Sequence, residues 1–140
     1  MKAYYQEYEK NEVICREGDP SSELYLLRSG RLLICTLQGT EVKALAEIHP
    51  GEFIGELSFF DGKPRSSTII ALEKSTIFQV PKHQISEYLP EWYRFVGKSL
   101  TKKIRQIDSV VQDSKIRKSP LTLPMDRQRE IYQIITQQIS

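Results

Sequence analysis

The chain has 140 residues, of which 39% are hydrophobic and 27% charged, and its formal net charge is +2. This length accommodates one domain with a substantial core, and the composition is that of a folded globular protein rather than a disordered chain. The near balance of acidic and basic residues gives no general case for nucleic-acid binding, and no apolar run is long enough to cross a bilayer.

Cysteines and histidines bear on the compartment and on metal binding. Cys15 and Cys35 each lie among apolar residues of an expected strand. We expect two buried, reduced thiols in a cytoplasmic protein, although the sequence alone also allows a disulfide. His49 and His83 are too few for a histidine-based metal cluster, and no Cys/His spacing of a zinc site occurs, so we predict no metal.

Up to Val80 the sequence alternates short β-rich runs with turns, and most of the turns contain glycine. Glycine permits the positive φ that tight turns need. The expected strands are Val13–Cys15, Leu24–Leu27, Leu32–Leu37, Val42–Ile48, Thr68–Leu72 and Thr76–Val80. Many short strands at this spacing predict a sandwich or a barrel-like roll.

After Pro81 the pattern becomes helical. We expect a short helix over Lys82–Leu89 and a long helix over 91–115 whose apolar residues recur in steps of four and three. The stripe consists of Leu100, Ile104, Ile107 and Val111. We expect residues 1–115 to form one domain and 116–140 to form a linker and a short amphipathic helix. Because that helical pattern reaches Ser140 without a stop signal, we expect it to begin an effector region that is missing or truncated.

Residues 50–68 have a composition suited to binding an anion. Gly55 can form a tight turn that lets a ligand approach the backbone. A single helical turn over Glu56–Phe60, which includes Leu57 and Ser58, would aim unpaired N–H groups at the anion. Arg65 can bring a two-pronged guanidinium to the same anion. Ser66 and Ser67 can add hydroxyl or backbone donors.

Glu56 is an acceptor in a site that otherwise favours anions, so it fits a ligand that also presents hydroxyl groups, as a ribose does. Taken singly, these residues are most often structural, since Gly-Glu-Leu is common and an arginine after a proline is usually a solvated loop residue. Together, inside a series of strands broken by glycine, they favour a ligand site.

The stretch Phe53-Ile-Gly-Glu-Leu through Pro64-Arg-Ser-Ser-Thr resembles the phosphate-binding cassette of cyclic-nucleotide-binding domains. This family includes the bacterial catabolite activator protein and the regulatory subunits of cyclic-AMP-dependent protein kinase. The resemblance covers about residues 5–115. It implies an α+β, mainly β fold: an antiparallel, jelly-roll-like β-roll (a double-stranded β-helix) flanked by short helices, with a long C-terminal helix.

The resemblance also assigns roles. It implies that Arg65 pairs with the cyclic phosphate, that Glu56 accepts a hydrogen bond from the ribose 2′-hydroxyl, and that Gly55 lines the sugar side. Ser66 and Ser67 would lie beside the phosphate and the base. The long helix would cover the base, with candidates Ile107, Asp108 and Ser109. A second interpretation makes Ile107 part of a dimer core and Asp108 a solvated helix residue.

No nucleophile, acid–base pair or metal-ligand set indicates catalysis, so we expect a regulatory binding module rather than an enzyme. The ligand would draw the long helix over the base, and the apolar stripe would form a homodimer. Ser66 after the arginine favours cyclic AMP, but a hydroxyl there also suits cyclic GMP. Two further alternatives remain: a ligand-free domain acting in protein–protein interaction, and the sensor half of a transcription regulator. No helix-turn-helix occurs in 116–140, so we expect no contact with nucleic acid.

Overall fold

The computed structural model describes residues 4–80, 90–113 and 123–137; for Tyr4 and residues 108–113 it describes the backbone only. In chain order the strands are β1 (Tyr4–Tyr8), β2 (Val13–Cys15), β3 (Leu24–Ser29), β4 (Leu32–Gln38), β5 (Glu41–Ile48), β6 (Phe53–Ile54), β7 (Thr68–Ala71) and β8 (Ser75–Val80). The helices are α1 (Glu56–Asp61), α3 (Glu91–Asp113) and α4 (Met125–Gln137).

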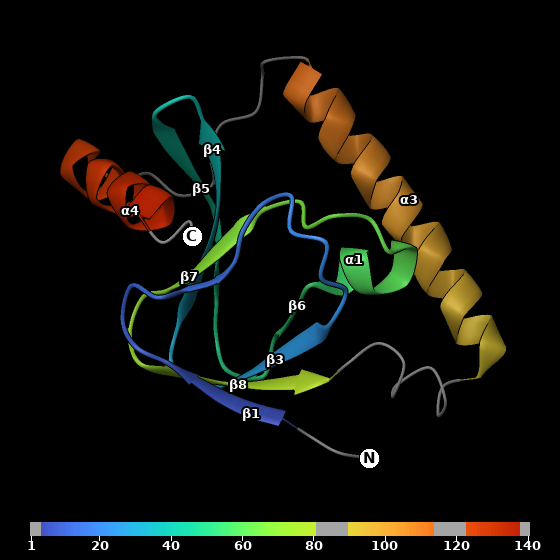
Figure 1. Cartoon of the computed structure of the whole chain (residues 1–140). Helices are drawn as coiled ribbons and strands as arrows, with labels where there is room; N and C mark the ends of the chain where they lie inside the picture. The colour runs from blue at the N-terminus through green and yellow to red at the C-terminus, as the bar shows by residue number, and fades with distance from the viewer. Residues whose placement is uncertain (1–3, 81–89, 114–122, 138–140) are drawn as a thin grey trace.

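The strands form two antiparallel sheets of four, with orders β1-β8-β3-β6 and β2-β7-β4-β5, and together they make a roll (Figure 1). The predicted mainly β fold with a long C-terminal helix is therefore confirmed. All six expected strands are present, with small differences at their ends. The helix expected over 82–89 lies outside the described residues.

The sequence analysis missed strands β1 and β6. The sequence of β1, YYQEY, contains no β-branched residue, and the strand lies at a sheet edge where it pairs only with β8. The strand β6 has two residues and pairs with β3, which is too short for a periodicity to show. Both strands depend on their neighbours rather than on their own sequence pattern.

The sheet β2-β7-β4-β5 is apolar on both faces, and each face belongs to a different core. The inner core consists of Cys15, Tyr25, Leu27, Leu32, Ile48, Ile54, Ile69, Ala71 and Ile77. The outer core consists of Leu33, Cys35, Val42, Ala44, Ile70, Ile131 and Ile135. Neighbouring residues such as Ile69 and Ile70 fall in different cores because successive side chains on a strand point to opposite faces.

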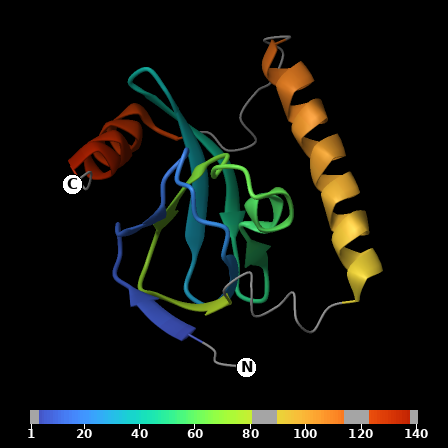
Figure 2. The ribbon, with the colours of Figure 1, turned by 45° about the vertical axis from the view of Figure 1, so that its right-hand side comes forward.

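The two long helices lie on opposite sides of the roll (Figures 1 and 2). Helix α4 packs on β5 and places Ile131 and Ile135 in the outer core. Helix α3 packs on α1. The C-terminal segment, which we expected to begin an effector region, thus has its helix packed on the same roll.

Both cysteines are buried and free, as expected. Burial raises the pKa of the Cys15 thiol to about 11 and that of Cys35 to about 12. Both side chains are therefore neutral thiols at physiological pH, one in each core.

Candidate functional site

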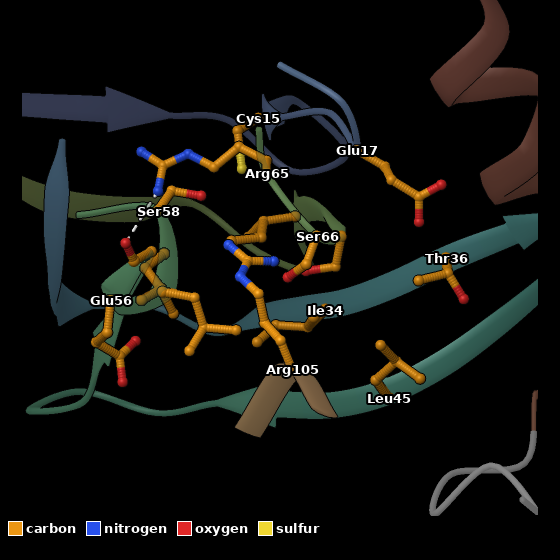
Figure 3. A pocket seen from close by; sticks show the side chains of 15 residues that line it. Cys15, Glu17, Ile34, Thr36, Leu45, Glu56, Ser58, Arg65, Ser66 and Arg105 are labelled. Atoms are coloured by element: carbon orange, nitrogen blue, oxygen red, sulfur yellow. Dashed lines mark hydrogen bonds between the residues drawn. The ribbon is translucent and has the colours of Figure 1, made fainter. Parts of the chain in front are cut away.

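A cavity of about 580 Å³ opens between α1, α3 and the inner face of the sheet β2-β7-β4-β5 (Figure 3). All seven cassette residues that we predicted at the site line it, from Gly55 to Ser67. The full lining is Cys15, Glu17, Ile34, Thr36, Leu45, Ile54, Gly55, Glu56, Leu57, Ser58, Arg65, Ser66, Ser67, Ile69 and Arg105. Ile34, Leu45 and Ile69, on β4, β5 and β7, form an apolar wall of the cavity, and the lining also carries charged and hydroxyl groups.

Gly55 is the N-cap residue of helix α1 and has the left-handed conformation, with φ of 84°. Its carbonyl accepts the first helical hydrogen bond, from Phe59 N–H at 3.0 Å. The N–H groups of the first turn precede that bond and have no acceptor within the helix. A Cβ at position 55 would collide with the Arg65 guanidinium, so glycine is required here both for its conformation and for the space it leaves.

The Arg65 guanidinium is buried, with a side chain only 3% exposed, and the roll holds it in place. Its Nε donates to Ser21 Oγ at 2.9 Å, Nη1 to the Gly55 carbonyl at 3.1 Å, and Nη2 to the Glu23 carbonyl at 2.7 Å. It also lies over the Tyr25 ring, 5.1 Å from the centroid. The Glu23 carboxylate lies 3.9 Å from Nη2 and compensates part of the buried positive charge.

These bonds leave donors on Arg65. A guanidinium has five N–H groups, and the three bonds above use one on each nitrogen. One N–H on Nη1 and one on Nη2 therefore remain for a further acceptor. The three bonds hold the guanidinium in place before any ligand arrives.

Two carboxylates line the same cavity. The pKa of Glu56 is raised, mainly because burial removes surrounding water from its carboxylate. A hydrogen bond from its own backbone N–H opposes this rise, and the nearby Glu52 carboxylate adds to it. Burial also raises the pKa of Glu17, whose backbone N–H donates to Thr68 Oγ1 at 3.0 Å. In Figure 3 Glu17 and Glu56 lie toward opposite ends of the cavity.

Helix α3 closes one side of the cavity and is held there by α1. Gly97 lies against the Phe60 ring, where a Cβ would overlap the ring, and Thr101 is buried. Arg105 donates from Nε to Asp61 Oδ2 at 2.5 Å and from Nη2 to Oδ1 at 3.2 Å. This forked ion pair brings the Arg105 side chain into the cavity lining.

The pair with Arg105 affects the titration of Asp61. Burial raises the pKa of Asp61. Hydrogen bonds from Arg105 and from the Lys63 backbone N–H lower it by more, so the pKa is below its ordinary value. The Asp61 carboxylate is therefore ionised throughout the physiological range.

The sequence profile described as "Cyclic nucleotide-binding domain" matches residues 5–91 of the chain. The chain belongs to this family. Among similar proteins, the cyclic nucleotide-gated channel alpha-4 of Mus musculus is 31% identical over 98 residues, which are 66% of this chain and 17% of the channel subunit. The cyclic AMP receptor protein of Thermus thermophilus is 30% identical over 112 residues, which are 76% of this chain and 52% of that protein.

Solved structures of the EAL enzyme Bd1971 share the fold of this cyclic nucleotide-binding domain. The cAMP-bound form has a TM-score of 0.66 and 26% identity, covering 81% of this chain and 32% of that one. The cGMP-bound form has a TM-score of 0.65 and 28% identity, covering 73% and 28%. Although some neighbours belong to enzymes, the shared part is a cyclic nucleotide-binding regulatory domain, which is not itself an enzyme.

Helix α3 of the cyclic nucleotide-binding domain presents a different residue to the cavity from those we considered. The Ile107 side chain is 63% exposed and is not part of the lining, and the side chains of Asp108 and Ser109 lie outside the described part. Among the α3 side chains that the structure describes, Arg105 lines the cavity, while the predictions at Asp108 and Ser109 stay predictions. The sequence analysis missed Arg105 because the rotation of α3 about its axis depends on the contact between Gly97 and Phe60.

Sequence reasoning also left out the apolar wall and Glu17. The alternation along β4 could have indicated Ile34 and Thr36, which share one face of that strand. Glu17 lies in a turn, where no periodicity applies.

Within the described ranges, no three His, Cys, Asp or Glu side chains come together in a way that could hold a metal ion. None of the helices that the structure describes is long and apolar enough to span a membrane.

Proposed function

We propose that this domain binds cyclic AMP in the cavity beside α1. The observation that carries the proposal is the buried Arg65, which is fixed by three hydrogen bonds and still has one N–H on each terminal nitrogen. This fork matches two oxygens of a cyclic phosphate. The N–H groups of Leu57 and Ser58 in the first turn of α1, which have no acceptor within the helix, add donors to the same anion.

In this proposal the other polar residues of the cassette bind the sugar and the base. Glu56 accepts from the ribose 2′-hydroxyl, and the Gly55 backbone lines the sugar. Ser66 and Ser67 lie beside the phosphate and the base. The apolar wall formed by Ile34, Leu45 and Ile69 offers a surface for the flat purine.

We propose cyclic AMP rather than cyclic GMP as the ligand because Ser66 directly follows the proposed phosphate-binding arginine. Similarity to the cyclic AMP receptor protein over 76% of the chain supports the same choice. Cyclic GMP is the second candidate, because a structure with this fold is known in a cGMP-bound form. No metal is part of the proposal.

Calorimetry with both nucleotides tests the proposal. We expect the purified chain to bind cyclic AMP more tightly than cyclic GMP. Arg65→Ala should weaken binding by about 3–5 kcal/mol, because it leaves the phosphate unpaired, and Glu56→Ala by about 1.5–3 kcal/mol. Arg129→Ala, on the exposed side of α4, is the control. No heat from either nucleotide at high micromolar concentration would refute the proposal, and unchanged affinity in folded Arg65→Ala would mean that the phosphate site is misplaced.

We further propose that the signal leaves through α3. Ligand in the cavity would draw α3 over the base, through Arg105 together with the candidates Ile107 and Asp108. The ligand shifts the position of the helix only if it binds the closed arrangement more tightly than the open one.

The quaternary and cellular parts of the proposal rest on residues outside the cavity. The stripe of α3 would form a homodimer through Leu100, Ile104, Ile107 and Val111. The first three are 55%, 45% and 63% exposed, which leaves them available for a partner.

The free thiols fit a reducing, cytoplasmic compartment. The division at residue 115, the effector region after it and the absence of nucleic-acid contact stay predictions.

A further inference from the structure

The sheet β2-β7-β4-β5 separates the cavity from helix α4. On β4, Ile34 and Thr36 line the cavity, whereas Leu33 and Cys35 belong to the outer core under α4. On β7, Ile69 lines the cavity, and its neighbour Ile70 belongs to the outer core. Any ligand in the cavity and helix α4 therefore contact opposite faces of the same strands.

The cavity face and the α4 face of these strands are joined at a β-bulge. Ile34 pairs with Ala46 and Cys35 pairs with Ala44, so Leu45 is an extra residue on β5 with no partner opposite. Leu45 lines the cavity. Its neighbour Ala44 is 1% exposed and belongs to the outer core. Because Leu45 and Ala44 are neighbours, a shift of this bulge would change the cavity wall and the surface under α4 together.

Helix α4 owes its order to docking on this surface. It has 13 residues, and isolated helices shorter than about 12–15 residues are marginal in water. Ile131 and Ile135 are 0% and 2% exposed, and they cover apolar side chains of β4, β5 and β7. Docking of α4 therefore requires the outer face of these strands to hold its present arrangement.

We propose that docking of α4 and occupation of the cavity are positively coupled through the bulged strands β4 and β5, so that α4 is a second element that responds to the ligand. The proposal rests on the proposed function, because the ligand is taken to be the cyclic nucleotide. Both events stabilise the same arrangement around Leu45, and thermodynamic reciprocity makes each strengthen the other by the same factor. Typical couplings of this kind correspond to about 5–150-fold in affinity.

The chain contains its own reporter for each face. Cys15 lines the cavity, and Cys35 lies in the outer core with α4. The labelling rate of each thiol by iodoacetamide can be followed by peptide mass spectrometry, with and without saturating cyclic AMP. The nucleotide can shield Cys15 directly but not Cys35, which faces away from it. We expect cyclic AMP to slow the labelling of Cys35 by about 5-fold or more.

The reciprocal measurement uses variants of α4. Ile135→Asp places a charge in the outer core and should undock the helix, whereas Gln133→Asp adds the same charge at an exposed position of that helix. We expect Ile135→Asp to speed Cys35 labelling and to weaken cyclic AMP binding by about 5-fold or more, with Gln133→Asp close to the native chain. Ile135→Ala gives a milder form of the same test if the aspartate variant does not fold.

Each outcome decides between the possibilities. Protection of Cys15 with an unchanged Cys35 rate overturns the coupling and leaves nucleotide binding intact. Slowed Cys35 labelling with unchanged nucleotide affinity in both Ile135 variants also overturns it, because the ligand would then only be suppressing global unfolding. No binding of cyclic AMP by the native chain overturns the proposed function and the coupling with it.

Discussion

Helices α3 and α4 are both amphipathic, but they bury their apolar residues differently. Helix α4 inserts Ile131 and Ile135 into the outer core of its own roll, where they are 0% and 2% exposed. Helix α3 contacts α1 through Gly97 and Arg105, and three residues of its apolar stripe, Leu100, Ile104 and Ile107, are about half exposed.

The difference shows that an apolar stripe on a helix does not by itself predict which surface packs on it. On α4 the stripe faces the sheet, and the residues there are aliphatic. On α3 the contacts with α1 are made by a glycine, an arginine and the ring of Tyr93, whose centroid lies 6.0 Å from that of Phe60, and Leu100, Ile104 and Ile107 are exposed. We expect α3, which docks through a glycine, an ion pair and a half-exposed tyrosine ring, to be held less tightly than α4, which docks through fully buried isoleucines.

The largest expected contrast is in stability. Ile131→Ala should lower the free energy of unfolding by about 3 kcal/mol, because it removes buried methyl groups and leaves a cavity, whereas the exposed Ile107→Ala should change it by less than about 0.5 kcal/mol in dilute monomer. Urea unfolding of both variants measures the difference. Equal losses would mean that the two helices are packed alike.

A second prediction concerns association. If the stripe of α3 forms the homodimer, Ile107→Asp should weaken dimerisation by about 2.5 kcal/mol, since a buried anchor is replaced by a charge. Lys102→Asp, at an exposed position of the same helix, is the control for the added negative charge. Sedimentation equilibrium gives both dissociation constants. A native chain that is monomeric at millimolar concentration would argue against the dimer.

Gly97 provides a smaller test of how α3 is held. Gly97→Leu should displace α3 from α1 at a cost of about 2 kcal/mol, because its side chain would overlap the Phe60 ring. Trp92, the one tryptophan of the chain, lies on the same helix and reports the change by fluorescence. Ser99→Leu, also on α3 but exposed, should leave the spectrum unchanged. An identical response from both variants would show that the contact with Phe60 does not position the helix.

The smallest predicted effect depends on pH. Because the pKa of Asp61 is lower in the folded chain than its ordinary 3.8, its pair with Arg105 stabilises the docked α3 above that range. This contribution, about 1 kcal/mol, is lost as the pH falls through the lowered pKa. Urea unfolding between pH 6 and 3 should show a steeper loss in the native chain than in Asp61→Asn. Parallel curves would mean that the pair contributes nothing.

Much of the roll could be predicted from local patterns, and the cassette from a few residues. The turn at Gly55 and the donors around Arg65 follow from residue types that have few alternatives. The ion pair of Arg105 could not be predicted, since it joins residues 44 positions apart whose meeting depends on how α3 rests on α1.

The docking of α4 on the outer face of the sheet, which the sequence analysis missed, did have a signal in the sequence. The four residues of β7, Thr68 to Ala71, are all buried, and a run without polar alternation is typical of a strand covered on both faces. The interior of the roll covers only one of these two faces. The isoleucines of the last helix were the available second cover, but a pattern cannot say whether such a helix docks on its own domain or on another.

The anchoring of Arg65 has a consequence for the thermodynamics of ligand capture. A flexible arginine must give up its rotamer freedom when it closes on a phosphate, at about 0.5–1.5 kcal/mol for a long side chain. Here Ser21, Gly55 and Glu23 hold the guanidinium before any anion enters. That entropy is lost when the chain folds, so it is absent from the binding equilibrium. A lysine in the same place would lack the planar fork, would leave those carbonyls only partly satisfied, and would have to be ordered anew at each encounter.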